Sequence, residues 1–146
     1  MIYTDLTKLA LRIAYQAHHG QEDKGHTPYF CHVFHVAEQM ENEDQTVTAL
    51  LHDVVEDTEE TIESLREKGI PENILRKVAL LSRKESENYD LYIDRIIESG
   101  DPDVLRVKYE DLCHNLDESR TDKGQLPQKL LDRYTRSRKK IQAALS

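Results

Sequence analysis

The sequence contains no tryptophan, only two cysteines and no long apolar run. The last two features argue against particular classes of protein. Cys31 and Cys113 stand far apart and form no C-x-x-C pair, which argues against a dithiol redox motif or a zinc ribbon. We expect both to be small packing residues. No run approaches the 18 apolar residues of a membrane span, and residues 1–10 lack an apolar signal core. We therefore expect a cytoplasmic protein with no membrane partner.

Positive charge is also in short supply. Lys and Arg number 20 against 28 Asp and Glu, which gives a formal net charge of −8. Non-specific affinity for DNA or RNA comes largely from neutralising phosphates, so we expect no nucleic-acid partner. A small phosphorylated ligand held by a few local cations remains compatible with this balance, and so does a homo-oligomer.

Residues that interrupt helices are few. The chain has 5 Gly and 4 Pro, its aromatic fraction is 6%, and its apolar residues recur mainly at helical spacing. Its 146 residues suffice for one domain, which we expect to span 1–146. The predicted fold is all-α, a compact single-domain bundle of about eight helices. The expected ranges are roughly 4–18, 29–42, 45–57, 59–68, 71–82, 88–99, 102–117 and 127–143.

The segment from His52 to Asp57 concentrates more chemistry than any other. On a continuous helix its apolar residues face one side, and the opposite side carries His52, Asp53, Glu56 and Asp57. Asp53 and Asp57 are four apart, where like charges destabilise a helix by roughly 0.2–0.5 kcal/mol, and no Lys or Arg offsets them. A bound cation would supply the missing positive charge. The alternative is a polar outer face with an ion pair between His52 and Glu56.

A second candidate group is His32, near the start of the helix predicted over 29–42. His35 lies three residues further on and shares its side of that helix. A histidine pair at this spacing can bind a metal, but a histidine without an accompanying carboxylate is more often a structural residue. Both interpretations stay open for His32 when this segment is taken alone.

The third candidate group lies in the helix predicted over 102–117. Lys108, Asp111 and Asn115 line one face, where a single ligand could touch all three. Lys108 and Asp111 could equally form a surface ion pair. We expect His114 to turn away from the Asp111 side.

Taken together, these residues resemble the HD superfamily of metal-dependent phosphohydrolases, whose ligands follow the order His, His-Asp, Asp. The resemblance implies one divalent ion with four ligands: His32, His52, Asp53 and Asp111. Two imidazoles and two carboxylates suit Mn²⁺, Fe²⁺ or Zn²⁺ better than Ca²⁺ or Mg²⁺. Mn²⁺ is the ion we expect.

The resemblance extends to the hydrolase domain of the Rel/SpoT family and to stand-alone small alarmone hydrolases, over roughly residues 11–120. The matching segments are 17–21, 28–32, 49–58, 80–83 and 108–115. This likeness implies that Glu56 and Asp57 orient or deprotonate the attacking water and that Asn115 contacts the nucleotide. Asp57 has a second open role, as the N-cap of the helix predicted over 59–68, with Glu60 at its third position.

Three cations are candidates for contacts with substrate phosphates: Lys24, Arg83 and Lys108. An ordinary surface charge is the alternative for each of them. The same alternative holds for the basic run 133–140 near the end of the chain, which we expect to be a solvated face.

The chain departs from the family pattern where the nucleotide would be recognised. Asp23 precedes Lys24 where the alarmone hydrolases carry an Arg-Lys pair whose arginine helps to hold guanine, and a carboxylate cannot replace a guanidinium. Leu112 stands where arginine is common, and residues 116–118 replace Met-Arg-Thr, which removes a cation and a hydroxyl. We expect the metal site to be intact and the specificity site to be altered.

The predicted function is metal-dependent hydrolysis of a nucleotide-like phosphate ester or anhydride, and the resemblance suggests 3′-pyrophosphohydrolysis of (p)ppGpp. A nucleoside mono- or triphosphate phosphohydrolase is the alternative enzyme. A non-catalytic, metal-containing nucleotide-binding module would lack the carboxylates after the His-Asp pair, yet Glu56 and Asp57 are both present. A purely structural helical domain would leave the ordered ligands unexplained.

Overall fold

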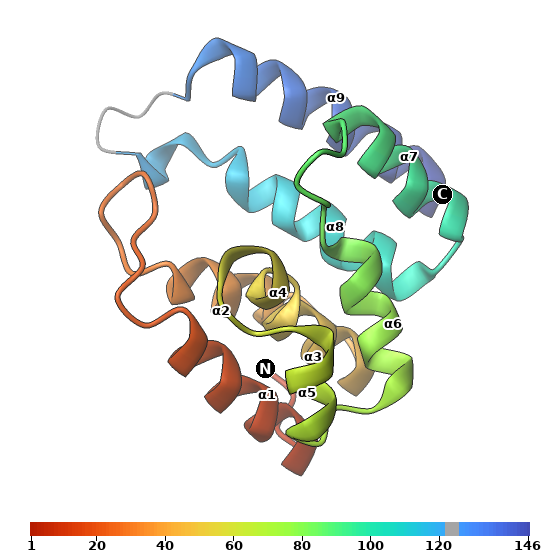
Figure 1. Ribbon diagram of the computed structural model, residues 1–146. Helices are drawn as coiled ribbons and strands as arrows, with labels where there is room; N and C mark the ends of the chain where they lie inside the picture. Colours follow the sequence, from red (N-terminus) through yellow and green to blue (C-terminus); the bar gives the residue numbers. More distant parts are fainter. Residues whose placement is uncertain (122–125) are drawn as a thin grey trace.

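The computed structural model describes residues 1–121 and 126–146. Over these residues the chain is built from helices and their connections, which confirms the predicted all-α bundle (Figure 1). The helices are α1 (Asp5–Ala17), α2 (Phe30–Glu38), α3 (Glu43–Leu51), α4 (Val54–Asp57), α5 (Ile62–Glu67), α6 (Glu72–Leu81), α7 (Tyr89–Ser99), α8 (Pro102–Asn115) and α9 (Gln128–Leu145), with one 3-10 turn, η1 (Glu118–Arg120).

Helix starts coincide with residues that cap free backbone amides. Thr4 and Thr61 open α1 and α5 with capping boxes, in which the threonine side chain and the side chain three residues on bond each other's backbone. Asp101 caps α8, and Pro102 occupies its first position. At the other end of a helix, Gly100 stops α7 with a left-handed φ of 64°. These local signals explain why most predicted boundaries are close to those observed.

The helix predicted over 45–57 is divided in two, which makes nine α-helices in the described ranges where about eight were predicted. The break falls at His52 and Asp53. Nδ1 of His52 lies 2.6 Å from the carbonyl oxygen of Ala49, so the imidazole bonds its own turn. Asp53 then adopts a ψ of −1°, and α4 starts as a new turn. The prediction of one continuous helix over residues 45–57, with a single polar side, is therefore wrong.

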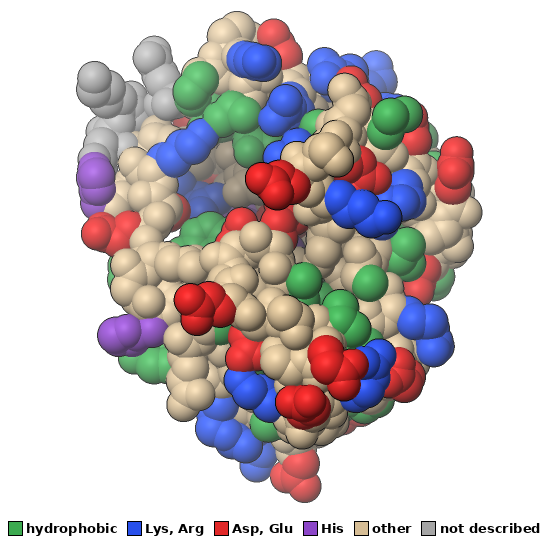
Figure 2. All heavy atoms as spheres, viewed as in Figure 1, with side chains coloured by type: hydrophobic (Ala, Val, Ile, Leu, Met, Phe, Trp, Pro, Cys, Tyr) green, Lys and Arg blue, Asp and Glu red, His purple; other side chains and the backbone are tan. Residues whose placement is uncertain are grey.

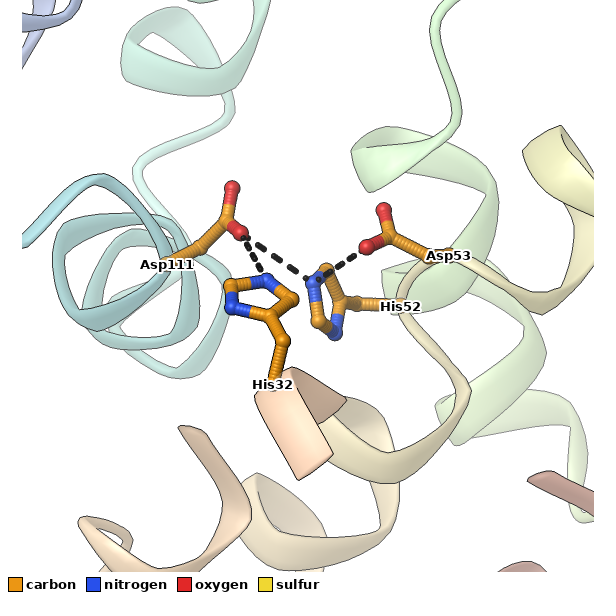
Figure 3. A group of neighbouring side chains, drawn as sticks. All are labelled: His32, His52, Asp53 and Asp111. Carbon is orange, nitrogen blue, oxygen red and sulfur yellow. Dashed lines mark hydrogen bonds and ion pairs between the residues drawn. The ribbon is translucent and has the colours of Figure 1, made fainter. Parts of the chain in front are cut away.

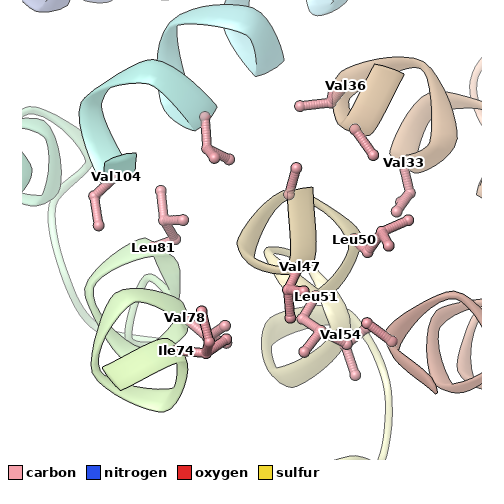
Figure 4. Close-up of a cluster of buried hydrophobic side chains, with 14 of the residues drawn as sticks. Val33, Val36, Val47, Leu50, Leu51, Val54, Ile74, Val78, Leu81 and Val104 are labelled. Carbon is pink, nitrogen blue, oxygen red and sulfur yellow. The ribbon is translucent and has the colours of Figure 1, made fainter. Parts of the chain in front are cut away.

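The hydrophobic core is centred on α3, whose residues 46–51 are all buried. Helices α1, α2, α6 and α8 pack around it. In Figure 4, Val47 and Leu51 lie on the side of α3 that meets Ile74 and Val78 of α6, while Leu50 lies toward Val33 of α2. A helix enclosed in this way is fixed by packing, so the residues at its C-terminal end are held in place.

Helix α9 lies along α8 and α7. Arg136 pairs with Asp90 of α7 at 3.2 Å, and Lys140 pairs with Asp94 at 2.6 Å. Part of the basic run 133–140, predicted to be a solvated face, therefore docks α9 onto α7. These pairs are half-exposed, so their contribution to stability is small.

The structure bears on the predictions made for membrane-spanning helices and for the two cysteines. Among the described residues, no helix combines the length and the apolar character needed to cross a bilayer. The cysteines are both free, but Cys31 is exposed and Cys113 is partly exposed. The expectation that both are packing residues is wrong for Cys31, because α2 turns Val33 and Val36 toward the core instead.

Candidate metal centre

The four predicted ligands converge from four different elements. His32 lies in the first turn of α2, His52 ends α3, Asp53 precedes α4, and Asp111 lies in α8. Figure 3 shows their polar ends pointing toward one another. One potential ligand atom from each residue lies within 4.8 Å of the others. Residues separated by up to 79 positions thus form one cluster that could hold a metal ion.

The break in the helix after α3 is what directs His52 and Asp53 into this cluster. Nε2 of His52 lies 3.0 Å from Oδ2 of Asp53 and 3.4 Å from Oδ1 of Asp111. His52 is buried, with an exposed fraction of 2%. The alternative of a solvated face with an ion pair between His52 and Glu56 is therefore wrong.

The hydrogen bonds of the two imidazoles leave their Nε2 atoms directed at the cluster. Because Nδ1 of His52 donates to a carbonyl oxygen, the proton that His52 loses when it becomes neutral is the one on Nε2, which then carries a lone pair. That buried Nε2 has no partner with hydrogen-bond geometry, although two carboxylates are close. A lone pair aimed between carboxylates is the arrangement in which a histidine binds a divalent metal, with its other ring nitrogen fixed by a second group.

His114 supplies the corresponding support for His32. Nδ1 of His32 lies 2.7 Å from Nδ1 of His114, and the two rings stack with centroids 5.0 Å apart. Burial and the nearby Arg120 lower the pKa of His114 to about 3, so its ring is neutral and can accept the proton of His32. The expectation that His114 turns away from the cluster is wrong. Its i+3 spacing from Asp111 was the signal that could have revealed this role.

Replacing His114 by alanine is expected to weaken divalent-metal affinity by about 10- to 100-fold, the usual effect of losing a group that orients a histidine ligand. His35 provides a matched control because it stacks on His114 at 3.9 Å while lying outside the ligand cluster. His35→Ala should retain most of the affinity. Metal titration of both variants checks this, and equal losses in the two would contradict an orienting role for His114.

The two carboxylates of the cluster, Asp53 and Asp111, also have dedicated partners. The Tyr29 hydroxyl donates to Oδ2 of Asp53 at 2.5 Å. Lys108 donates from Nζ to Oδ2 of Asp111 at 2.8 Å and is itself buried, with an exposed fraction of 7%. The alternative of a surface ion pair between Lys108 and Asp111 is therefore wrong. Asp111 keeps its other oxygen, Oδ1, toward His32 and His52, whereas in Asp53 the oxygen bonded by Tyr29, Oδ2, is also the one near His52.

The pKa values of the cluster residues favour ionised carboxylates and a protonated His52. Burial would raise the pKa of Asp111, but Lys108 and the bond with His32 hold it well below its usual value. Burial opposes ionisation of Asp53 as well, yet His52 lowers its pKa to about 2. Burial would lower the pKa of His52, but Asp53 and Asp111 raise it. A metal would therefore bind between two ionised carboxylates and displace a proton from His52.

A small cavity of about 170 Å³ opens beside the cluster and holds the predicted catalytic carboxylates. Oε2 of Glu56 accepts a hydrogen bond from the backbone N–H of Arg83 at 3.1 Å. Asp57 is not a helix cap, because Thr61 caps α5 and Glu60 pairs with Lys68. The side chain of Asp57 is thus available to the cavity.

The carboxylates in this cavity hold protons more tightly than usual. Burial and then the nearby Asp53 and Glu56 raise the pKa of Asp57 to about 7. Burial also raises the pKa of Glu56, although the Arg83 amide works against it. A carboxylate with a pKa near neutrality is suited to accept a proton and later release it.

Asp57→Asn is expected to raise the Tm of the chelator-treated protein at neutral and alkaline pH. The pKa of Asp57 rises on folding from 3.8 to about 7, so between these values the folded state holds a proton that the unfolded state releases. Stability from this group is therefore present below about pH 4 and lost as the pH rises through 7. An amide does not ionise, so thermal denaturation should show the largest gap near pH 8. A gap that does not change with pH would contradict this origin.

Cations of the small cavity gather around the ring of Tyr89. Arg83 and Arg133 lie 5.4 Å and 4.7 Å from its centroid, and Lys108 lies at 5.7 Å. Arg83 and Lys108 were predicted. Arg133 was missed because its position depends on how α9 packs over α8, which the local sequence does not reveal.

A larger cavity of about 400 Å³ adjoins the small one, and Tyr29, Asn115 and Tyr134 line both. Figure 2 shows the hollow on this face, with acidic and basic side chains around its opening. Lys24, from the predicted loop 20–28, lies at the larger cavity. The four predicted substrate residues are thus divided: Lys24 lines the larger cavity, Arg83 and Lys108 the smaller, and Asn115 both.

One predicted loss is corrected by the structure. Residues 116–118 do replace Met-Arg-Thr, but Arg120 and Thr121 follow a short distance on and line the larger cavity. The turn η1 brings them there. The Arg-Thr dipeptide, displaced by three residues, was the sequence signal that could have found them. A cation and a hydroxyl are therefore present at this cavity.

Comparison with known proteins defines the class. A family model described as HD domain matches residues 10–86, which is more than half of the chain. The chain belongs to the HD domain family.

Its relatives narrow this class to a Rel/SpoT-like HD domain. A GTP pyrophosphokinase of Myxococcus xanthus is 33% identical over 151 residues, covering 89% of this chain and 20% of that protein. A GTP pyrophosphokinase rsh of Brucella melitensis is 32% identical over 128 residues, covering 77% and 17%. The chain thus spans about a fifth or less of the length of these relatives. A solved structure described as "A metazoan ortholog of SpoT hydrolyzes ppGpp and plays a role in starvation responses" matches with a TM-score of 0.79 and 25% identity, over 99% of this chain and 88% of that one.

Proposed function

We propose that the chain is a metal-dependent phosphohydrolase that acts on a nucleotide-like phosphate ester or anhydride. The observation that carries this proposal is the placement of Glu56 and Asp57 in a cavity that also contains Asp53 and Asp111 of the ligand cluster. A metal site beside carboxylates of raised pKa can activate and deprotonate water. The HD family implies a divalent metal, and Mn²⁺ is our proposal for its identity, with Fe²⁺ or Zn²⁺ as alternatives.

The proposed substrate is (p)ppGpp, hydrolysed at its 3′-pyrophosphate. Support comes from the metazoan SpoT ortholog, described as hydrolysing ppGpp, which covers 99% of this chain. The two adjoining cavities support it too, because one offers cations beside the metal cluster and the other has room for a nucleoside. The Asp23-Lys24 sequence in loop 20–28 is the point where this chain differs from the family's base-binding pattern.

The charged residues of the small cavity divide the parts of this reaction among them. A metal held by His32, His52, Asp53 and Asp111 would polarise a phosphoryl oxygen of the substrate and lower the pKa of water. Asp57 accepts a proton from the attacking water, and Glu56 orients that water. Arg83 and Arg133 bind the negative charge of the leaving group. Lys108 keeps Asp111 in place through their hydrogen bond.

Two alternatives make different predictions for the same site. A nucleoside mono- or triphosphate phosphohydrolase would use the same carboxylates but a different substrate orientation. A nucleotide-binding module without catalysis would not need Glu56 and Asp57 in the cavity, and their presence favours an enzyme. The domain extent 1–146, the cytoplasmic location, the absence of a nucleic-acid partner and any homo-oligomer stay predictions from the sequence.

The test is an assay of phosphate and pyrophosphate release from a panel of nucleotides that includes ppGpp, with the protein loaded with Mn²⁺. Pyrophosphate release from ppGpp is the expected result. Release of single phosphates from ordinary nucleotides, with ppGpp unchanged, would favour the alternative enzyme. A stoichiometric metal with no turnover of any nucleotide would favour the binding module.

A further inference from the structure

Asp57 is the last residue of a helix that is too short to hold itself in place. Helix α4 spans only four residues, and the amide of Asp57 donates to the carbonyl oxygen of Asp53 at 2.9 Å. A single helical turn is unfavourable without contacts from outside. The carbonyl oxygen of Asp57 has no partner within the helix, because the last carbonyls of a helix cannot find one there. The position of Asp57 therefore depends on a group outside α4.

That group is the side-chain amide of Gln21. Its Nε2 donates to the carbonyl oxygen of Asp57 at 2.9 Å, across 36 positions of sequence. Gln21 and Asp57 both line an outer cavity of about 650 Å³, and Asp57 also lines the small cavity. Gln21 is not among the described residues that form the ligand cluster or line the small and larger cavities. It thus meets Asp57 from outside the proposed site.

The buried ring of His18 fixes which way this amide points. A carbonyl oxygen can only accept, so the end of Gln21 that faces Asp57 is its NH₂ group. Its Oε1 then faces Nδ1 of His18 at 2.9 Å, and Nδ1 is the donor. His18 is 1% exposed, and burial lowers its pKa, so the ring is neutral at pH 7. A flipped amide would place two donors together at His18 and two acceptors together at Asp57.

The backbone of Gln21 is also bonded on both sides. Its N–H donates to the carbonyl oxygen of His18 at 3.0 Å, and its own carbonyl oxygen accepts from the N–H of Tyr29 at 2.8 Å. The Tyr29 hydroxyl in turn donates to Asp53. Gln21 therefore joins the end of α1, the start of α2 and the end of α4. Asp57 and one carboxylate of the ligand cluster are both connected to it.

We infer that Gln21, oriented by His18, is a positioning residue that holds the end of α4 and thereby keeps the Asp57 carboxylate in place. This inference rests on the proposed function and adds to it a residue outside the metal cluster and the substrate cavities. A displacement of about 1 Å in a reacting geometry can cost roughly 100-fold in rate. Loss of the Gln21 amide should therefore slow turnover through Asp57, while KM and metal content stay unchanged.

Two substitutions of Gln21 separate the hydrogen bond from charge. Gln21→Met removes the whole amide, whereas Gln21→Glu keeps an oxygen for His18 and loses the donor to Asp57. In the Mn²⁺-loaded full chain, both should lower kcat for ppGpp hydrolysis by about 10- to 100-fold without changing KM. If Gln21→Met does not fold because His18 lacks its acceptor, Gln21→Glu decides. Gln16→Met is the matched control, since Gln16 is an exposed glutamine that lines the same outer cavity, and its kcat should equal that of the wild type.

Combining these substitutions with Asp57→Asn distinguishes positioning from a general structural role. If Gln21 acts through the Asp57 carboxylate, its replacement should cost almost nothing further once that carboxylate is gone. A loss by the same factor in both backgrounds would overturn the inference. Unchanged turnover in the Gln21 variants would overturn it as well.

Amide hydrogen exchange reports the hydrogen bond between Gln21 and Asp57 without requiring turnover. In the Gln21 variants, residues 53–58 should exchange roughly 2- to 10-fold faster, the effect of losing one intramolecular hydrogen bond. Mass spectrometry of the Mn²⁺-loaded full chain measures this rate. Unchanged exchange would overturn the inference whether or not the protein is an enzyme. Faster exchange in a protein that hydrolyses no nucleotide would support the hold on α4 while refuting the proposed function.

Discussion

The Asp57→Asn variant is expected to keep its divalent metal and to hydrolyse substrate about 10²- to 10⁴-fold more slowly than the wild type, the usual contribution of a general base. Asp57 lies in the small cavity with Asp53 and Asp111, where its carboxylate can accept a proton from water; in the metal-free protein, burial and these neighbouring carboxylates raise its pKa. An asparagine has the same shape but cannot accept the proton. Single-turnover rates with saturating Mn²⁺ measure the effect.

A structural explanation for that loss can be excluded with the backbone contacts of Asp57. Its carbonyl oxygen accepts from Gln21 at 2.9 Å and its amide donates to Asp53 at 2.9 Å, and both bonds survive the substitution. Glu59→Gln is a matched control, since Glu59 is an exposed carboxylate two residues away that lies outside the small cavity. Unchanged turnover in Asp57→Asn with full metal content would remove Asp57 from the mechanism.

His52→Ala is expected to abolish metal binding and, with it, turnover. Removing a ligand should cost more than the roughly 10- to 100-fold in affinity that follows loss of a supporting group. It also leaves Asp53 and Asp111 facing each other across the buried cluster with one imidazole fewer. Two carboxylates without sufficient compensating charge destabilise the fold.

Thermal denaturation with and without Mn²⁺ reports this loss independently of catalysis. A ligand at 100 times its Kd stabilises the folded state by about 2.7 kcal/mol, so Mn²⁺ should raise the Tm of the wild type. It should leave the Tm of His52→Ala unchanged. His19→Ala is the matched control, since His19 is an exposed histidine outside the ligand cluster, and its Tm should respond as the wild type does. An equal response in His52→Ala would contradict the ligand assignment.

The proximity of His32, His52, Asp53 and Asp111 could be predicted because these residues follow a family pattern in the sequence. His52 and Asp53 are adjacent, and His32 and Asp111 follow the family order, so the four residues could be named before their positions were known. Their geometry could not be predicted. The prediction assumed a continuous helix. The hydrogen bond from His52 to the carbonyl oxygen of Ala49 competes with the backbone bonds of that helix, and the spacing of apolar residues does not reveal such a bond.

Three other residues of the site were missed for a different reason. His114, Arg120 and Arg133 reach the site only through tertiary packing, of α8 on α2, of η1 on loop 20–28 and of α9 on α8. In their own segments the signals are weak: the spacing of His114 from Asp111, the displaced Arg-Thr dipeptide at Arg120, and none for Arg133. The role of Asp23 could not be predicted for the same reason. The sequence suggests that Asp23 replaces a guanine-binding arginine, but in the structure it accepts a hydrogen bond from Arg120, which lies 97 positions away.

The most direct test of the account is the metal content of the purified protein by elemental analysis, after loading with Mn²⁺ and removal of free ions. The wild type and His19→Ala should each carry about one divalent ion per chain, as one four-ligand site requires. His52→Ala should carry almost none. Equal metal content in His52→Ala and the wild type would show that the cluster of His32, His52, Asp53 and Asp111 is not the metal site.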